Sequence, residues 1–276
     1  MKRIHIILLI AIIATGKISA QSYRQLTEQG IKYIEEKQYK EAIGTLMQAI
    51  QAEPDNKGNG YVYANIAYAQ SNINETEKAI ESYGKALSYK PHDTELLRQR
   101  ARLFIFIDEK DSALVDYNRI LKIKPDDTHS LLMRAYIYEN IKEYGKAYDD
   151  YYTILKNEPE NTNARLALAL LYHKDGHTNE CTILLEQLID EKPEDASAYM
   201  ARANIEIKEK QYELARIDIE KALELQPEKS EYHVSMAELL LLSGKKRGAK
   251  RFLDKAVTLG HNRYMLEKYY KQISKE

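Results

Sequence analysis

Small residues recur along this chain at a step of 34 residues, after a first step of 37. One series comprises Ala42, Ala79, Ala113, Ala147, Cys181, Ala215 and Ala249. A second series precedes the first by twelve residues and comprises Gly30, Ala67, Ala101, Ala135, Ala169, Ala203 and Ala237. Two small residues twelve apart, with a turn between them, allow two antiparallel helices to approach closely.

Larger apolar residues follow the first series at helical spacing. Four residues on stand Leu46, Tyr83, Tyr117, Tyr151, Leu185, Ile219 and Leu253. Seven residues on stand Ala49, Ala86, Ile120, Ile154, Leu188, Ala222 and Ala256. Offsets of four and seven place these side chains on one face of a helix. Each repeat is therefore predicted to be a helical hairpin that cannot bury its apolar face without a neighbour.

The prolines mark the boundaries between these hairpins. The chain has six of them: Pro54, Pro91, Pro125, Pro159, Pro193 and Pro227. Proline stops helices and biases the preceding residue towards extended geometry, so a proline on a fixed period indicates stacked units. Four hydroxyl residues follow shortly after a proline and are predicted to cap the first helix of their unit: Thr94, Thr128, Thr162 and Ser230.

The pattern resembles the tetratricopeptide repeat, with a small residue at unit position 8, Ala at 20, a bulky residue at 24 and Pro at 32. Seven units fit: 23–56, 60–93, 94–127, 128–161, 162–195, 196–229 and 230–263. The resemblance implies an all-α fold, a right-handed superhelical α-solenoid of seven helix-turn-helix repeats within residues 21–263. Residues 264–276 are expected to form a capping helix. At unit position 11, Gln70 and Glu206 depart from the aromatic residues of four other units, which are Tyr33, Phe104, Tyr138 and Tyr172.

Residues 1–20 have the layout of a secretory signal peptide. Lys2 and Arg3 precede an apolar run from Ile4 to Ala14, and Ile18-Ser19-Ala20 forms a cleavage motif. The run of about 11 residues is shorter than the roughly 20 that span a bilayer. We therefore expect cleavage after Ala20 and an exported mature protein, periplasmic or secreted, that does not span a membrane. Retention by an uncleaved signal segment is the alternative.

Charge and cysteine content narrow the chemistry. The chain has 41 basic and 42 acidic residues, a formal net charge of −1, which argues against a nucleic-acid partner. The single cysteine, Cys181, occupies a position that is otherwise alanine, which favours a small buried residue over a nucleophile. His173 and His177 have the spacing of a metal clamp, but Asp175-Gly176 places a turn between them. We expect no enzyme activity, no cofactor and no catalytic, cofactor-binding or metal-binding residues.

Three units carry Arg at position 7 together with Asp at position 23. The pairs are Arg100 with Asp116, Arg134 with Asp150, and Arg202 with Asp218. Residues equidistant from a hairpin turn lie at the same height on antiparallel helices, which predicts three ion pairs within units. The alternative is that these arginines contact a ligand.

The resemblance also implies a binding groove, because in this family the first helices line the concave side of the superhelix. The groove positions carried over to this chain are Tyr61, Tyr68, Asn72, Arg98, Arg102, Phe106, Tyr136, Asn140 and His173. Arg98 and Arg102 are four residues apart, so both belong to one stripe of a helix. Aromatic and arginine side chains together suit an extended peptide with an acidic group.

The function expected from these features is that of an exported scaffold for protein–protein interaction. Its partner is expected to be a protein or an extended peptide held in the concave groove. The alternative is a module that binds a saccharide or an envelope polymer, with the groove tyrosines stacking on sugar rings.

Overall fold

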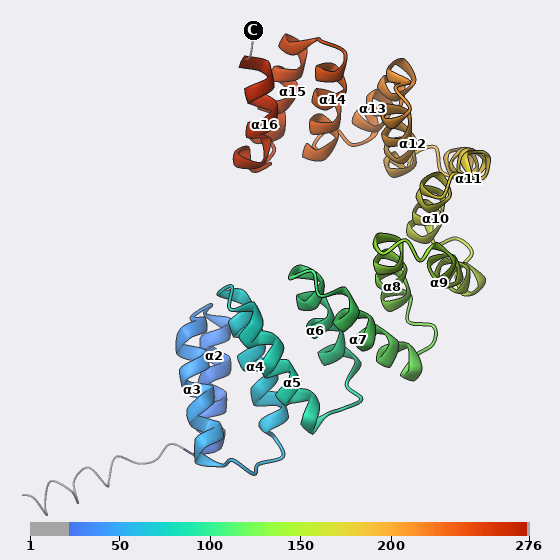
Figure 1. Ribbon diagram of the computed structural model, residues 1–276. Coiled ribbons are helices and arrows are strands. Elements are labelled where there is room, and N and C mark those ends of the chain that lie inside the picture. Colours follow the sequence, from blue (N-terminus) through green and yellow to red (C-terminus); the bar gives the residue numbers. More distant parts are fainter. Residues whose placement is uncertain (1–21, 275–276) are drawn as a thin grey trace, which may run out of the picture. The chain divides into compact units, whose positions relative to one another are not determined.

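The computed structural model describes residues 22–274, and within this range it contains helices and no strands. In chain order the helices are α2 (Tyr23–Glu35), α3 (Tyr39–Ala52), α4 (Asn59–Asn72), α5 (Thr76–Tyr89), α6 (Thr94–Phe106), α7 (Lys110–Ile123), α8 (Thr128–Asn140), α9 (Tyr144–Asn157), α10 (Thr162–Lys174), α11 (Thr178–Glu191), α12 (Ala196–Lys208), α13 (Tyr212–Leu225), α14 (Ser230–Leu242) and α15 (Lys246–Thr258). A single helix, α16 (Arg263–Ser274), follows. The predicted all-α solenoid is confirmed (Figure 1).

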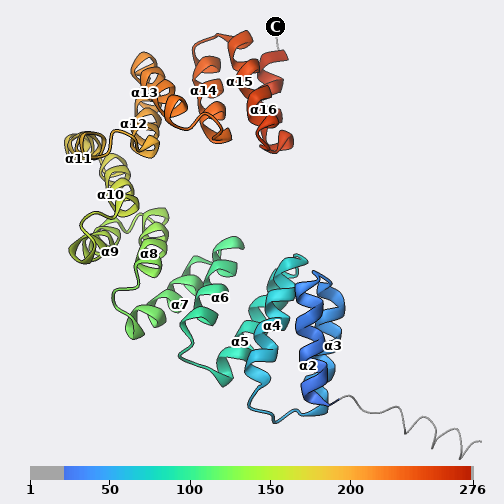
Figure 2. The ribbon, with the colours of Figure 1, turned by 180° about the vertical axis from the view of Figure 1, so that it is seen from behind.

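The chain divides into two compact units, residues 1–137 and residues 138–276. We refer to these two halves of the chain as unit 1 and unit 2; each contains several of the 34-residue repeats. In the described part of unit 1, α3 packs on α4 and α5 packs on α6, so three hairpins stack in chain order (Figure 2). In unit 2, α10 packs on α9, and the following hairpins continue in chain order to α16.

The small residues lie where the two helices of a hairpin cross. Ala42, Ala79 and Ala113 are completely buried, as are their partners Ala67 and Ala101 on the first helices. In the first hairpin the partner is Gly30, where an added Cβ would lie only 2.5 Å from Cγ and Cδ2 of Leu46. The close approach of α2 and α3 therefore depends on the missing side chain.

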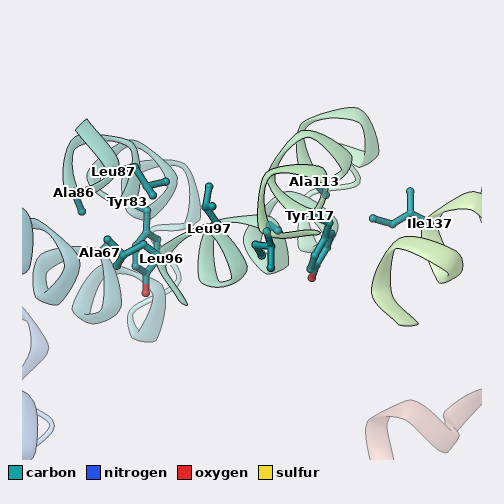
Figure 3. Close-up of a cluster of buried hydrophobic side chains, with 11 residues drawn as sticks. Ala67, Tyr83, Ala86, Leu87, Leu96, Leu97, Ala113, Tyr117 and Ile137 are labelled. Atoms are coloured by element: carbon teal, nitrogen blue, oxygen red, sulfur yellow. The ribbon is translucent and has the colours of Figure 1, made fainter. Parts of the chain in front are cut away.

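Packing between hairpins builds the apolar core of unit 1, which includes a cluster around Leu46, Val62 and Ile66 and a larger cluster further along the chain. Figure 3 shows the cluster that joins α4, α5, α6 and α7, in which Leu97 lies between Tyr83 and Tyr117. The hydroxyl groups of both tyrosines point to the same side of this cluster. At the other end of the chain, Leu266 of α16 is buried against Ala237, Ala249 and other apolar residues of α14 and α15. The last hairpin thus has its apolar face covered by α16, as a capping helix requires.

The caps of the first helices differ from the prediction by one residue. Asp93 caps α6, with its carboxylate accepting from the backbone N–H groups of Glu95 and Leu96 at 3.0 and 3.2 Å. Asn161 caps α10 in the same manner. The predicted caps Thr94, Thr128, Thr162 and Ser230 are instead the first helical residues. A carboxylate or amide is an acceptor that reaches the free N–H groups of the first turn, so the preceding residue takes this role in α6 and α10. Before α14 the preceding residue is Lys229, which makes no side-chain cap.

Two of the three predicted ion pairs are confirmed. Arg100 donates to both oxygens of Asp116, at 2.8 and 2.7 Å, and Arg202 donates to both oxygens of Asp218, at 2.6 and 2.8 Å. Asp116 and Asp218 are buried, so each carboxylate depends on its arginine for compensation. The third pair, Arg134 with Asp150, joins residues on opposite sides of the boundary between the units and stays a prediction.

No helix within residues 22–274 is both long enough and apolar enough to cross a membrane. The predicted signal peptide, residues 1–20, lies outside the described residues.

Candidate functional site

The first helices of unit 1 present aromatic side chains to solvent. The exposed fractions are 63% for Tyr61, 46% for Tyr68, 76% for Phe106 and 51% for Tyr136. Tyr61 and Tyr68 belong to α4, Phe106 ends α6 and Tyr136 belongs to α8. We call these four residues, together with Arg102 of α6, the unit-1 aromatic face.

Neighbouring groups hold the α4 side of this face in place. The ammonium group of Lys90 lies 2.9 Å from the centre of the Tyr61 ring, and Tyr39 meets Tyr68 edge-to-face with ring centres 6.3 Å apart. Both arrangements are favourable contacts of an aromatic ring. Asn72 uses its amide to donate to the backbone oxygen of Tyr68 at 2.8 Å, so it contributes to the end of α4.

The two arginines of α6 have different surroundings. Arg98 donates to Glu95 at 2.6 Å and to Asp127 at 2.9 Å, and the side chains of Arg98 and Asp127 are only 19% and 16% exposed. Although burial raises the pKa of Asp127, hydrogen bonding from Ser130 and the charge of Arg98 hold that pKa below its usual range. Arg98 therefore links α6 to the start of α8. Arg102 is exposed and makes no ion pair with any residue in the described part of the chain.

Beneath Arg102 lies a polar group that the sequence did not reveal. The hydroxyl of Tyr117 is buried and has no hydrogen-bond partner among the described residues. Burial raises the pKa of Tyr117 to about 12, an effect that Arg102 and Arg98 partly oppose. Burial also raises the pKa of Tyr83 to about 12. Both phenols are neutral donors at neutral pH, and Figure 3 shows that their hydroxyls point the same way.

His129 of α8 is a second group that sequence reasoning missed. Burial lowers its pKa, and the nearby positive charges of Arg98 and Arg102 lower it further. The imidazole is therefore neutral at neutral pH and adds no positive charge to this surface.

The remaining predicted groove residues belong to unit 2. Asn140 is exposed at the end of α8. His173 is largely buried, and its Nδ1 lies 3.7 Å from Oε1 of Glu209 without forming a hydrogen bond. His177 lies beside Asp175 and Glu180 instead. Among residues 22–274 there is no group of three or more His, Cys, Asp or Glu side chains that could hold a metal ion.

Cys181 is 2% exposed, as its place in the small-residue series predicts. Burial raises its pKa to about 11, so the thiol is protonated at neutral pH and lacks the thiolate that a nucleophile requires.

Comparison with known proteins agrees with the helical-hairpin architecture. Models of the tetratricopeptide repeat match residues 61–93, 142–205 and 196–229. The crystal structure of a tetratricopeptide repeat protein from Parabacteroides merdae has 27% sequence identity and a TM-score of 0.78, covering 92% of this chain and 99% of its own. A crystal structure of the MamA protein has 19% identity and a TM-score of 0.52, covering 64% of this chain and 97% of its own. No curated protein matches with significance.

The chain is therefore a tetratricopeptide repeat protein. Proteins of this class are generally non-enzymatic, and the fold is that of a scaffold for protein–protein interaction.

Proposed function

We propose that the protein is exported and binds a protein or an extended peptide along the unit-1 aromatic face. The observation that carries this proposal is the exposure of four aromatic rings, between 46% and 76%, on the successive first helices α4, α6 and α8, of which α6 also carries the exposed Arg102. Exposed apolar groups gathered on one surface mark an interaction site. Aromatic and arginine side chains are also the types that most often dominate binding energy.

The chemistry of the face favours a peptide with an acidic group. Arg102 is exposed and has no carboxylate partner among the described residues, so a ligand carboxylate gains a charge-assisted hydrogen bond there. Arg98 does not take part, because Glu95 and Asp127 already compensate its charge.

Export is proposed from the positive start, the apolar run and the small-residue cleavage motif of residues 1–20. The partner is then sought among envelope or secreted components. An intact mass that matches a chain beginning at Gln21 supports this location, whereas a mass that includes residues 1–20 indicates an anchored protein.

Affinity purification from the envelope fraction tests the binding proposal. The test variant combines Tyr68→Ala with Phe106→Ala, and the control is Tyr264→Ala on α16, where the ring is 79% exposed but lies in unit 2. We expect the double variant to lose the partner that the parent and the control retain, with unchanged helicity. Retention of the partner by the double variant would contradict the proposal. If no protein partner is found and the protein binds a glycan on a glycan array, the saccharide alternative is favoured.

A further inference from the structure

Unit 2 contains a cavity of about 380 Å³ between α11, α12 and α13. Leu185, Leu214 and Ile217 form an apolar wall, and both Leu214 and Ile217 are more than half exposed. Glu206 lines the cavity together with the ion pair of Arg202 and Asp218. We call it the Glu206 cavity. Its volume falls in the range of small-ligand sites, and it is separate from the unit-1 aromatic face.

The polar groups of the cavity are unequally satisfied. Asp218 has both oxygens occupied by the guanidinium of Arg202. Glu206 is 9% exposed, and its Oε2 is buried without a hydrogen-bond partner in the described part of the chain. A buried carboxylate without a donor costs free energy, so the fold alone gives no reason for an acid at this position.

Other repeats of the same chain show how this position is normally filled. Within each 34-residue repeat, the residue at position 11 faces the residue at position 23, twelve residues later. In the second repeat these are Gln70 and Ser82, and the serine hydroxyl donates to the amide oxygen at 2.7 Å. In the third repeat Phe104 occupies position 11, and Arg100 lies over its ring at 5.7 Å. The sixth repeat keeps the Arg–Asp pair but replaces the aromatic ring by Glu206.

The groups around Glu206 make the site attractive to a cation. Burial, assisted by the charges of Asp218 and Glu209 and opposed by that of Arg202, raises the pKa of Glu206 to about 7. From the other helices packed on the cavity, α11 contributes Glu186 and the neutral thiol of Cys181, and His173 of α10 lies next to Glu209. Four carboxyl groups therefore face one arginine. A cation that enters the cavity lowers the cost of ionising Glu206.

We propose that the Glu206 cavity binds an alkylammonium group, with the ammonium donating to the Glu206 carboxylate and the methylene chain lying against Leu214 and Ile217. A carboxylate is an acceptor only, and an ammonium supplies up to three donors from a compact centre. The methylene stem of an alkylammonium covers apolar surface while its charged end is paired.

Two sources supply this chemistry, a free diamine and a lysine side chain of a partner protein. Both require the ionised form of Glu206, whereas at low pH a proton replaces the cation. With a pKa of about 7, the ionised fraction rises about tenfold between pH 6 and pH 8. The association constant for either source is expected to rise by the same factor over that interval.

Titration calorimetry on the full chain, in amine-free buffer, tests the proposal with four probes. They are 1-aminopentane, 1,5-diaminopentane, Nα-acetyl-lysine methylamide and, as the uncharged isostere, 1-pentanol. We expect the amines to bind at one site about tenfold more tightly at pH 8 than at pH 6, and pentanol not to bind. Tighter binding of the lysine derivative than of the diamine assigns the site to a partner lysine, and the reverse assigns it to a free diamine.

Variants separate binding at Glu206 from general attraction to an acidic surface. Glu206→Gln keeps the shape and removes the charge, Glu206→Phe installs the aromatic residue of the third repeat, and the exposed Glu194→Gln serves as control. We expect both Glu206 variants to lose amine binding while keeping a cooperative melting transition, and the control to bind as the parent does. Equal binding by parent and Glu206→Gln, binding independent of pH, or no binding of any amine overturns the proposal.

Discussion

The raised pKa of Glu206 leads to a quantitative prediction of how stability depends on pH. Replacing it by Gln keeps the size of the side chain and removes the group whose pKa the fold raises from 4.5 to about 7. The folded state therefore holds a proton that the unfolded chain has released between these two pH values. For a raised pKa, the associated stability is fully present below pH 4.5 and is lost as the pH rises through 7.

The size of the effect follows from the difference between the two pKa values. The pKa of Glu206 is about 2.5 higher in the folded protein, and each pKa unit is worth about 1.4 kcal/mol, so the difference corresponds to about 3 kcal/mol of unfolding free energy. The parent loses this amount between pH 4.5 and pH 8, whereas Glu206→Gln does not. The variant is expected to match the parent at pH 4.5 and to exceed its stability by up to about 3 kcal/mol at pH 8.

Urea unfolding followed by circular dichroism, at four pH values from 4.5 to 8.5, measures this difference. The buffers must be free of amines, because a bound ammonium would stabilise the parent and mask the effect. The control is Glu194→Gln, whose exposed carboxyl predicts a difference that stays near zero at every pH. A stability difference between Glu206→Gln and the parent that stays constant across the pH range, or a variant that is less stable than the parent at pH 8, would show that the fold does not raise the pKa of Glu206.

Three further predictions concern packing and polar groups. A double-mutant cycle of Arg134→Ala and Asp150→Ala is expected to give a coupling of roughly 0.5–3 kcal/mol in urea unfolding, and additive effects would return Arg134 to the candidate ligand contacts. Gly30→Ala forces Leu46 to move and should lower the unfolding free energy by about 1–3 kcal/mol. At Gly44 an added Cβ meets nothing within 4 Å, so Gly44→Ala should stabilise the protein by about 0.5–1 kcal/mol. Equal effects at both glycines would argue against the close helix crossing. Tyr117→Phe removes a hydroxyl that has no partner in the described structure, so thermal melting should show a change between zero and about 1 kcal/mol of added stability, and a clear loss would reveal a partner.

The sequence predicted the hairpins well because their packing repeats. A small residue such as Ala101 or Ala113 performs the same task in every unit, so each position is read several times along one chain. The pairs Arg100–Asp116 and Arg202–Asp218 were predictable for the same reason, since both partners lie in one hairpin. The family pattern then supplied the first-helix positions that form the unit-1 aromatic face.

Features that depend on contacts between neighbouring repeats were harder to predict. Arg98 looked like a free groove cation, but it pairs with Asp127, 29 residues away and beyond the next helix. The sequence marked Glu206 as a departure from the repeat, yet it did not reveal that Asp218 was already taken by Arg202 or that Oε2 lacked a donor. Such accounting requires the positions of all neighbouring donors, which the repeat pattern alone does not supply.

Site-specific photo-crosslinking tests the central claim, that the unit-1 aromatic face is where the partner binds. p-Benzoylphenylalanine replaces Tyr68, Phe106 or Tyr264 in turn, in cells that export the protein, and mass spectrometry identifies whatever becomes attached. Our expectation is the same protein or peptide adduct at positions 68 and 106 and none at 264, which lies on α16 and is at least as open to solvent as the other two. Adducts at 264 alone, or none at 68 and 106 while the partner still co-purifies, would contradict it and place binding on another surface.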